Sequence, residues 1–344
     1  MTKFIIHIGP HKTGTTYLQL SFRALRAELA ARGTIFPEFW ELAPGNPSQL
    51  KLTNQLREGQ MELLRPRFAE LLESGAERIL ISSEDLSNLD TEALQRLRGL
   101  IGAHEVRIVF YPRRWSDLAP SSWQEGIKHG QSYTFPEFML AHLQRPDDSR
   151  LLNFDIKLSA FTNVFGMEQV SLVSYSELRD QGVDLFNHFC QHFLDWADPP
   201  PGWTKKSNES RNPGDTELLR ALNAMGRIQN IPARDTIRRA FDRVKRQNMS
   251  PLLAPAMARH VEALRLNDHM PALARLHEAL AAKYLPCMLV PRPAHFLFRP
   301  KNTEIQYIGG DYMAEQGVSV GLRQLFNRVR VEMDRLETVP AIAG

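Results

Sequence analysis

The sequence contains little cysteine and no long apolar segment. Only two of its 344 residues are cysteines, Cys190 and Cys287, and both lie in apolar surroundings without metal-ligand spacing. A disulfide framework and a cysteine-based metal site are therefore not expected, and a reducing compartment is the simplest interpretation. No window approaches the roughly 18 to 20 apolar residues of a membrane span, and the N-terminal MTKFII does not have the form of a secretory signal. We therefore expect a cytoplasmic protein without a membrane span.

A large excess of one charge is also lacking. The 42 basic and 39 acidic residues leave a formal net charge of +3. This mild positive charge suits an anionic ligand but does not require nucleic acid, and we expect no nucleic-acid partner. With 43% hydrophobic and 24% charged residues, the chain has the composition of a globular protein with a sizeable core. Its length allows one large or two modest domains.

Short apolar segments alternate with helical patterns in the first part of the chain. Apolar segments typical of buried strands occur at 4–8, 34–36, 78–82, 106–111 and 169–175. Helical patterns occur at 15–32, 48–57, 61–73, 116–130, 135–144 and 182–195. This alternation predicts an α/β fold of three layers, with a central parallel sheet of about four to five strands covered by helices on both faces.

The pattern changes at residues 197–215, which are rich in Pro, Gly, Ser and Asn. Helical patterns then follow at about 215–227, 233–247, 251–266, 269–284 and 318–337. We therefore predict an α/β core over residues 1–212 and a mostly helical C-terminal extension over residues 213–344. The extension is either a lid or part of the same domain.

Residues 4–20, FIIHIGPHKTGTTYLQL, combine an apolar strand, a glycine-containing turn and the start of a helix. A phosphate-binding loop needs this context, because backbone N–H groups and the positive end of the helix can then face one anion. Loops that bind ATP or GTP carry a lysine directly after the second glycine, but here that residue is Thr15 and the lysine is Lys12. A phosphosulfate, whose sulfuryl end carries one negative charge and needs no bridging metal, would suit this arrangement. The alternative is a chance Gly-Thr turn.

The segment PHKTGTTYLQ resembles the 5′-phosphosulfate loop of bacterial sulfotransferases, which reads roughly P-K-S-G-T-T-W-L in that family. The matching residues are Lys12, Thr13, Gly14, Thr15 and Thr16, with Tyr17 where the family often has tryptophan. The resemblance implies a P-loop-type fold, with 3′-phosphoadenosine 5′-phosphosulfate (PAPS) as sulfuryl donor, adenosine 3′,5′-bisphosphate (PAP) as product, and no metal. Weaker similarity extends it over roughly residues 1 to 225.

The second motif lies in YPRRWSDLAPSSWQE, which follows the strand at 106–111. Arg113 and Ser121 have the eight-residue spacing with which the resembled family binds the 3′-phosphate of PAPS. A guanidinium forms a forked, charge-assisted pair with phosphate, and a hydroxyl adds another donor. Arg114 and Ser122 have the same spacing, so the register is open by one residue. We prefer Arg113, because Asp117 then also falls where the family often has aspartate.

Sulfuryl transfer requires a base for the acceptor's proton and a positive group for the leaving phosphate. Lys12 is the natural candidate for the second task. Glu84 lies just past the strand at 78–82, where sulfotransferases commonly place their base, and we predict that it is the base; its alternative role is to cap a helix in the segment SSED. His11 and His129 are the competing candidates.

The leading hypothesis is therefore an enzyme, a PAPS-dependent sulfotransferase that acts on a hydroxyl or amine of a small-molecule or saccharide acceptor. One alternative is a P-loop kinase or NTPase with an atypical loop, against which the position of the lysine argues. The other is a non-catalytic nucleotide-binding protein, against which the presence of both motifs argues. The sequence indicates neither the acceptor nor the oligomeric state.

His7, on the first strand, is expected to be a hydrogen-bonded core residue.

Overall fold

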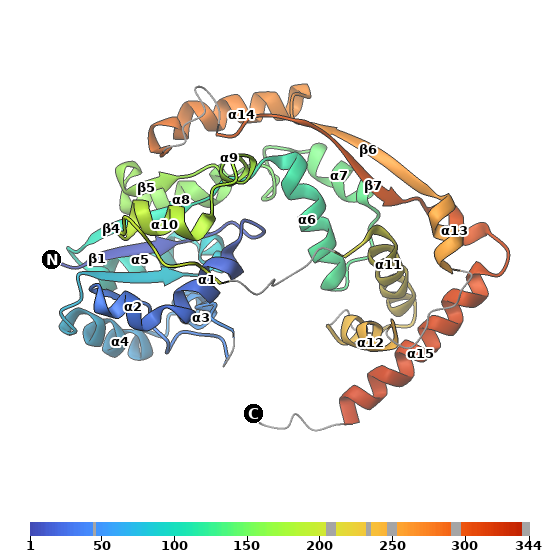
Figure 1. Ribbon diagram of the computed structural model, residues 1–344, viewed down its shortest axis with the longest axis horizontal. Coiled ribbons are helices and arrows are strands. Elements are labelled where there is room, and N and C mark those ends of the chain that lie inside the picture. The colour runs from blue at the N-terminus through green and yellow to red at the C-terminus, as the bar shows by residue number, and fades with distance from the viewer. Residues whose placement is uncertain (44–45, 204–210, 232–234, 246–252, 290–296, 339–344) are drawn as a thin grey trace. The chain divides into compact units, whose positions relative to one another are not determined.

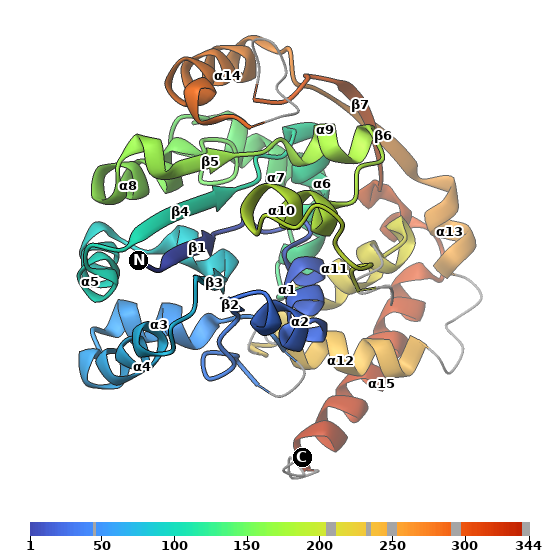
Figure 2. The same cartoon turned by 60° about the vertical axis from the view of Figure 1, so that its left-hand side comes forward.

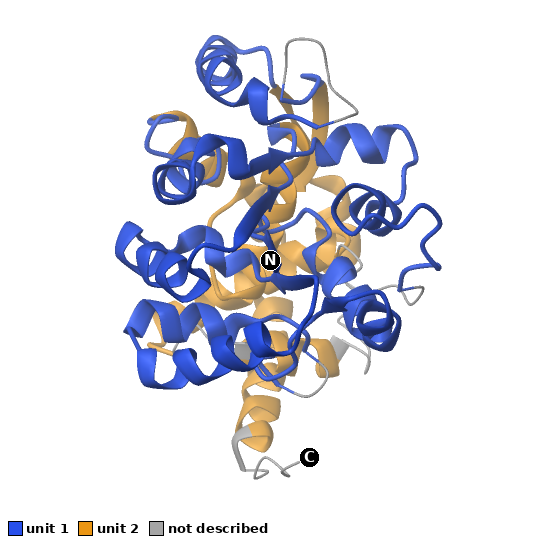
Figure 3. Cartoon of the chain, turned by 90° about the vertical axis from the view of Figure 1, so that its left-hand side faces the viewer, with its two compact units in different colours: residues 1–115, 145–208, 268–301 blue, residues 116–144, 209–267, 302–344 orange. Residues whose placement is uncertain are grey.

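The computed structural model describes residues 1–43, 46–203, 211–231, 235–245, 253–289 and 297–338. The chain forms two compact units, which Figure 3 shows in different colours. Unit 1 consists of residues 1–115, 145–208 and 268–301, and unit 2 consists of residues 116–144, 209–267 and 302–344. The predicted boundary between residues 212 and 213 is not tested by this grouping and stays a prediction.

Unit 1 contains the predicted sheet, with five parallel strands in the order β2-β3-β1-β4-β5. The strands are β1 (Lys3–His7), β2 (Thr34–Ile35), β3 (Arg78–Ser82), β4 (Glu105–Phe110) and β5 (Val170–Leu172). The central strand is β1, which pairs with β3 on one side and β4 on the other. The strand order therefore reverses at β1. In open α/β sheets, ligands bind beyond the carboxyl ends of the strands at such a point.

Helices cover both faces of this sheet (Figures 1 and 2). The helices of unit 1 are α1 (Thr15–Ala24), α2 (Arg26–Ala31), α3 (Leu50–Glu58), α4 (Met61–Glu73), α5 (Thr91–Ile101), α8 (Asp155–Phe165), α9 (Tyr175–Asp180), α10 (Leu185–Phe193) and α14 (Pro271–Tyr284). Ile5 and Val109 point to one face and join a buried cluster with residues of α1, α2 and α10. Phe4 points to the other face, where its ring stacks on Phe68 of α4 with centroids 6.1 Å apart. The three-layer α/β architecture is therefore confirmed, although the predicted helix over 15–32 is divided into α1 and α2.

Unit 2 is mostly helical, as predicted for the C-terminal part. Its helices are α6 (Trp115–Lys128), α7 (Phe135–Leu143), α11 (Pro213–Ile228), α12 (Asp235–Lys245), α13 (Leu253–Arg259) and α15 (Val318–Thr338). In the part of the chain that the structure describes, no helix has both the length and the apolar character needed to cross a membrane. The thiols of Cys190 and Cys287, both in unit 1, are buried and free.

The prediction of a helix over 251–266 is wrong in its second half. Residues Val261–Asn267 form strand β6, which pairs antiparallel with β7 (Asn302–Ile308). The sequence VEALRLN contains good helix formers, so local propensity alone favours a helix. Pairing with β7, which places Leu266 in a buried position at 2% exposure, overrides that preference.

Candidate phosphate-binding site

The loop between β1 and α1 is a tight turn held by its own threonines. Lys12 and Gly14 have positive φ values of 68° and 77°, a region that suits glycine but strains other residues. The hydroxyl of Thr13 donates to the carbonyl of Pro10 at 2.6 Å. Gly14, which precedes α1, offers no side chain to cap the helix. The first N–H groups of α1 therefore face the turn without a side-chain acceptor from the cap position.

Gly14 is also required by the space around it. A Cβ added to Gly14 would lie 2.5 Å from Cδ2 of Leu185 and 3.4 Å from the ring of Tyr175. Leu185 begins α10 and Tyr175 begins α9. The start of α1 is thus packed against two helices from much later in the chain, and the backbone of the turn has little freedom.

Arg113, which follows β4, lies against this loop. Its Nη1 donates to the carbonyl of Lys12, 101 residues away in the sequence. Its guanidinium carbon lies 5.4 Å from the ring centroid of Tyr175. The N–H of Tyr175 in turn donates to the carbonyl of Pro112 at 3.0 Å. The segments that follow β1, β4 and β5 are therefore in contact at the carboxyl edge of the sheet.

Arg114 is fully buried and points into a network of protein partners. Its Nε donates to the carbonyl of Arg299 at 2.7 Å, and its Nη2 donates to Oδ2 of Asp180 at 2.6 Å. Its backbone N–H donates to Oγ of Ser176 at 3.0 Å. Burial raises the pKa of Asp180, but hydrogen bonds from Lys301 and Arg114 outweigh burial and lower that pKa to about 2. The guanidinium of Arg114 thus anchors the end of β4 to α9.

Glu84 lies directly beyond β3, at the start of the short 3-10 helix η1. Nε2 of Gln19, on α1, donates to Oε2 of Glu84 at 3.1 Å and to the carbonyl of Ser82 at 3.2 Å. The Glu84 side chain is only 18% exposed. A Cβ added to Gly9 would lie 3.0 Å from the Cβ of Glu84. Glu84 therefore sits against the phosphate-loop backbone, and α1 orients its carboxylate.

The imidazole of His11 lies near the carboxylates of both Glu84 and Asp85. Nδ1 of His11 lies 3.8 Å from Oε1 of Glu84, and its Nε2 lies 3.5 Å from Oδ1 of Asp85. The hydrogen bond with His11 is the main cause that lowers the pKa of Asp85, against an opposing effect of burial. Ser83, which precedes η1, makes no capping bond through its side chain. The carboxylate of Glu84 thus faces loop and α1 side chains.

Two of the predicted site residues belong to unit 2. Ser121 lies half-buried on α6, and His129 follows the end of that helix, with its Nε2 3.3 Å from Oε1 of Glu125. Lys12, Glu84 and Arg113 belong to unit 1. The pairing of Arg113 with Ser121 therefore stays a prediction from their spacing.

Two residues beside the site, Gln19 and Tyr175, were not predicted, and the sequence contains a weak signal only for Gln19. Gln19 is 2% exposed and interrupts the apolar face that Leu18 and Phe22 form on α1. A polar residue inside such a stripe needs a buried partner, which here is Glu84. Tyr175 comes shortly after β5, at the same sheet edge as the loop. Its position in the fold, and hence its contact with Arg113, cannot be derived from local sequence.

His7 is a buried core residue, as predicted. It is 0% exposed, and its Nδ1 lies 2.9 Å from Oγ of Ser82. Its ring meets that of Tyr111 edge-on, with centroids 5.6 Å apart. Burial lowers the pKa of His7 to about 3. The imidazole directly before the loop is therefore neutral in the folded protein near neutral pH.

Acidification is expected to destabilise the protein through His7. Since its pKa is about 3 when folded and about 6.5 when unfolded, only the unfolded chain binds the proton between these values. The free energy of unfolding therefore keeps its full value above about pH 6.5 and decreases below it, by about 2 kcal/mol at pH 5. Urea unfolding at pH 7.5 and pH 5 should show this extra loss in the wild type and not in His7→Gln. Equal losses in both proteins would show that His7 titrates normally.

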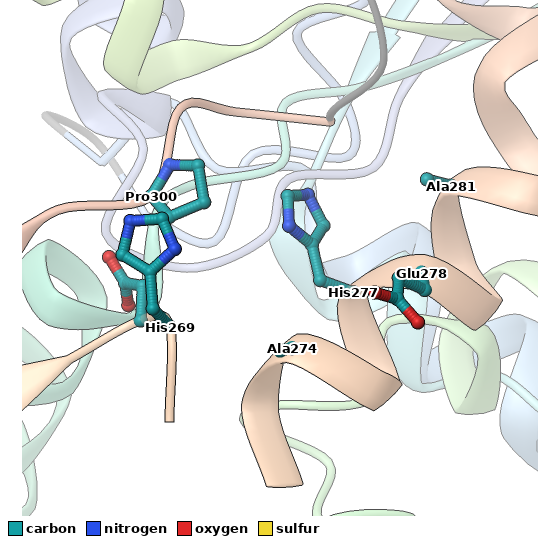
Figure 4. Close-up of a pocket in the computed structure, with 7 residues that line it drawn as sticks. His269, Ala274, His277, Glu278, Ala281 and Pro300 are labelled. Atoms are coloured by element: carbon teal, nitrogen blue, oxygen red, sulfur yellow. The ribbon is translucent and has the colours of Figure 1, made fainter. Parts of the chain in front are cut away.

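Unit 1 also contains a pocket of about 130 Å³, shown in Figure 4. It is lined by Asp268, His269, Ala274, His277, Glu278, Ala281 and Pro300. The backbone N–H of Leu297 donates to Nε2 of His277 at 3.1 Å. Burial, and then the charge of His269, lower the pKa of His277 to about 4. The lining includes none of the predicted site residues.

Among the described residues, no group of three or more His, Cys, Asp or Glu side chains could hold a metal ion.

No protein-family model matches the chain, and no curated protein matches it. Among solved structures, the chain is similar to the crystal structure of a sulfotransferase from Alicyclobacillus acidocaldarius. The TM-score is 0.36 and the sequence identity 19%, and the match covers 61% of this chain and 87% of that chain. The match is thus to a bacterial sulfotransferase, but a likeness of this degree is no evidence for a shared activity. The α/β fold itself rests on the strand order of unit 1.

Proposed function

We propose that the chain is a sulfotransferase that moves a sulfuryl group from PAPS to an acceptor hydroxyl or amine. The observation that supports this most directly is the grouping of three chemically suited residues at the ends of adjacent strands. Lys12 follows β1, Glu84 follows β3 and Arg113 follows β4. Arg113 bonds to the carbonyl of Lys12, and His11 of the same loop lies 3.8 Å from Glu84. A cation for a leaving phosphate and a candidate base therefore flank one loop.

The features of the loop support a phosphosulfate donor over a nucleoside triphosphate. The N–H groups of the first turn of α1, with the hydroxyls of Thr15 and Thr16, would hold the 5′-phosphate. A triphosphate loop needs its lysine on the helix side of Gly14, where it reaches the terminal phosphates. Lys12 lies on the turn, two residues before Gly14. It would instead contact the phosphate from which the sulfuryl group departs.

The surroundings of the two neighbouring arginines favour Arg113 as the ligand of the 3′-phosphate. Arg114 is fully buried and bonds to Asp180 and to the carbonyl of Arg299. To bind a phosphate, it would have to leave these partners in the interior. Arg113 is half-buried beside the loop. We retain Ser121 as its proposed partner, since that hydroxyl has the matching spacing.

In the proposed reaction, Glu84 takes the proton of the acceptor hydroxyl while the hydroxyl oxygen attacks sulfur. The bond between sulfur and the 5′-phosphate oxygen breaks, and PAP leaves with the electron pair of that bond. Lys12 stabilises the negative charge that grows on the leaving phosphate. Gln19 keeps the carboxylate of Glu84 in place through its 3.1 Å hydrogen bond.

The activity is tested by supplying PAPS with a labelled sulfuryl group to a panel of saccharide and small-molecule acceptors in the presence of EDTA. Transfer of the label without a divalent metal is the expected result. Transfer from ATP that depends strictly on magnesium would instead show a kinase. Tight binding of PAPS without turnover on any acceptor class would favour a non-catalytic nucleotide-binding protein.

PAP is expected to bind at least tenfold more tightly than AMP, because Arg113 would form charge-assisted bonds with the additional phosphate. Such contacts contribute about 1.5–3 kcal/mol each. Calorimetry with both nucleotides measures the difference, and Arg113→Ala should remove it. If Arg114→Ala removes it in a protein with an unchanged melting temperature, the register is shifted by one residue. Equal affinities of the wild type for PAP and AMP would contradict the assignment of PAPS as donor.

A further inference from the structure

A basic side chain is held at the end of η1 that lies opposite Glu84. The 3-10 helix η1 runs over Glu84–Asn88 in unit 1, which corresponds to about 8 Å along its axis. Nη2 of Arg150 donates to Oδ1 of Asn88 at 3.1 Å. Arg150 comes shortly before α8, the helix that packs against η1. Because the amide of Asn88 is neutral, this bond fixes the guanidinium beside η1 without cancelling its charge.

A second cation, Lys157, lies in the first turn of α8. This helix belongs to the connection between the parallel strands β4 and β5. The connection returns from the carboxyl edge of the sheet to the amino edge, so the first turn of α8 lies toward the edge that carries Glu84. Burial, and then the positive charge of Arg150, lower the pKa of Lys157 to about 8. Arg150 and Lys157, the basic pair, are thus two like charges close together, and an anion between them would relieve their repulsion.

Two carboxylates near the basic pair are engaged by other side chains. Oδ1 of Asp155, on the same turn of α8, accepts from Nζ of Lys283 at 2.7 Å. Oδ1 of Asp85, on η1, lies 3.5 Å from Nε2 of His11. Neither carboxylate forms an ion pair with a member of the basic pair, so both cations keep their charge for a ligand.

We propose that Arg150 and Lys157 bind an anionic group of the acceptor. This inference rests on the proposed sulfuryl transfer, and it specifies the acceptor as an acid that carries a carboxylate, sulfate or phosphate. Arg150 offers a forked donor to such a group, and Lys157 offers a compact charge. The phosphates of the donor are assigned to Lys12 and Arg113, after β1 and β4. The basic pair is held at η1, which begins with the residue assigned to the acceptor.

The test is protection of Lys157 from acetylation in the full chain at low salt and without PAPS. Acetic anhydride modifies only amines that have lost their proton, and mass spectrometry measures the extent at each lysine. Trigalacturonate and 4-hydroxyphenylacetate are the acidic probes, and their methyl esters are the neutral controls. The acids should slow the acetylation of Lys157 at least about threefold, which corresponds to a rise of about 0.5 in its pKa. The esters should not slow it, and Lys3, which pairs with Glu105 at 3.0 Å, should react equally throughout.

Arg150→Gln should remove the protection of Lys157, because the forked donor is lost. Arg265→Gln is the matched control, since it changes the net charge equally at a side chain that is 76% exposed, and protection should persist in it. Lys157→Gln removes one of two like charges, so its melting temperature should equal or exceed that of the wild type. A fall of the melting temperature by several degrees would show that Lys157 supports the fold and not a ligand.

The proposal is overturned if neither acid protects Lys157, or if protection is as strong in Arg150→Gln as in the wild type. Protection by PAP in place of the acids would assign the basic pair to the donor and overturn it too. With labelled PAPS, the wild type should prefer each acid over its ester at least about tenfold in kcat/KM, and Arg150→Gln/Lys157→Gln should lose this preference.

The two assays separate this inference from the proposed function. If esters are sulfated and the acids do not protect Lys157, only the inference fails and sulfuryl transfer stands. If the acids protect Lys157 but no acceptor is sulfated, the anion site stands and the proposed sulfotransferase activity fails.

Discussion

Replacement of Lys12 by alanine is expected to lower kcat for sulfuryl transfer by a factor of about 10² to 10³, the usual cost of losing a group that stabilises charge in the transition state. The binding of PAP should weaken much less. An interaction that strengthens as the S–O bond breaks contributes to turnover more than to ground-state binding. Turnover with saturating PAPS and calorimetry with PAP measure the two effects separately.

The backbone at Lys12 provides a control against a merely structural role. Lys12 adopts a φ of +68°, which glycine accommodates without strain. Lys12→Gly removes the ammonium group and relieves the backbone, so its melting temperature should be equal to or above that of the wild type while kcat stays low. If Lys12→Gly and Lys12→Ala both retain normal kcat, Lys12 does not act on the leaving group.

The sheet of unit 1 could be predicted from the sequence because its strands are buried on both faces. Segments such as FIIHI and RILIS are then continuous apolar runs, which stand out from the helices between them. The strands β6 and β7 have no such signal. Val261 is 45% exposed while Leu266 is 2% exposed, so β6 is buried only in part. Its sequence VEALRLN is therefore no continuous apolar run, and its helix-forming residues mislead. Its structure depends on pairing with a segment more than thirty residues later.

For the candidate site, too, some features could be predicted from the sequence and others could not. The loop around Lys12 could be predicted because its strand, glycines and helix are adjacent in the sequence. The different surroundings of Arg113 and Arg114 could not, because the partners that bury Arg114 come from α9 and from Arg299. Burial of a charged group requires such partners, and they become visible only when the chain is folded.

Replacement of Glu84 by glutamine is expected to lower kcat by a factor of about 10² or more, because the amide keeps the shape of the side chain but cannot accept the proton of the acceptor. The affinity for PAPS should barely change, since Glu84 is assigned to the acceptor. The hydrogen bond from Gln19 to Oε2 can be retained by the amide oxygen. The position of the side chain should thus be preserved, and the variant tests the proton transfer itself.

Asp85→Asn is the matched control for Glu84→Gln, because Asp85 is the other acidic residue in the first turn of η1 and also contacts His11. If Glu84 only stabilises the start of η1, the free energy of unfolding should decrease by a similar amount in both variants, about 1 kcal/mol or less, and turnover should stay near normal. If Glu84 is the base, only Glu84→Gln should lose turnover in protein of normal melting temperature. Normal kcat in Glu84→Gln would place the base elsewhere, and His11→Ala and His129→Ala would then be the variants to measure.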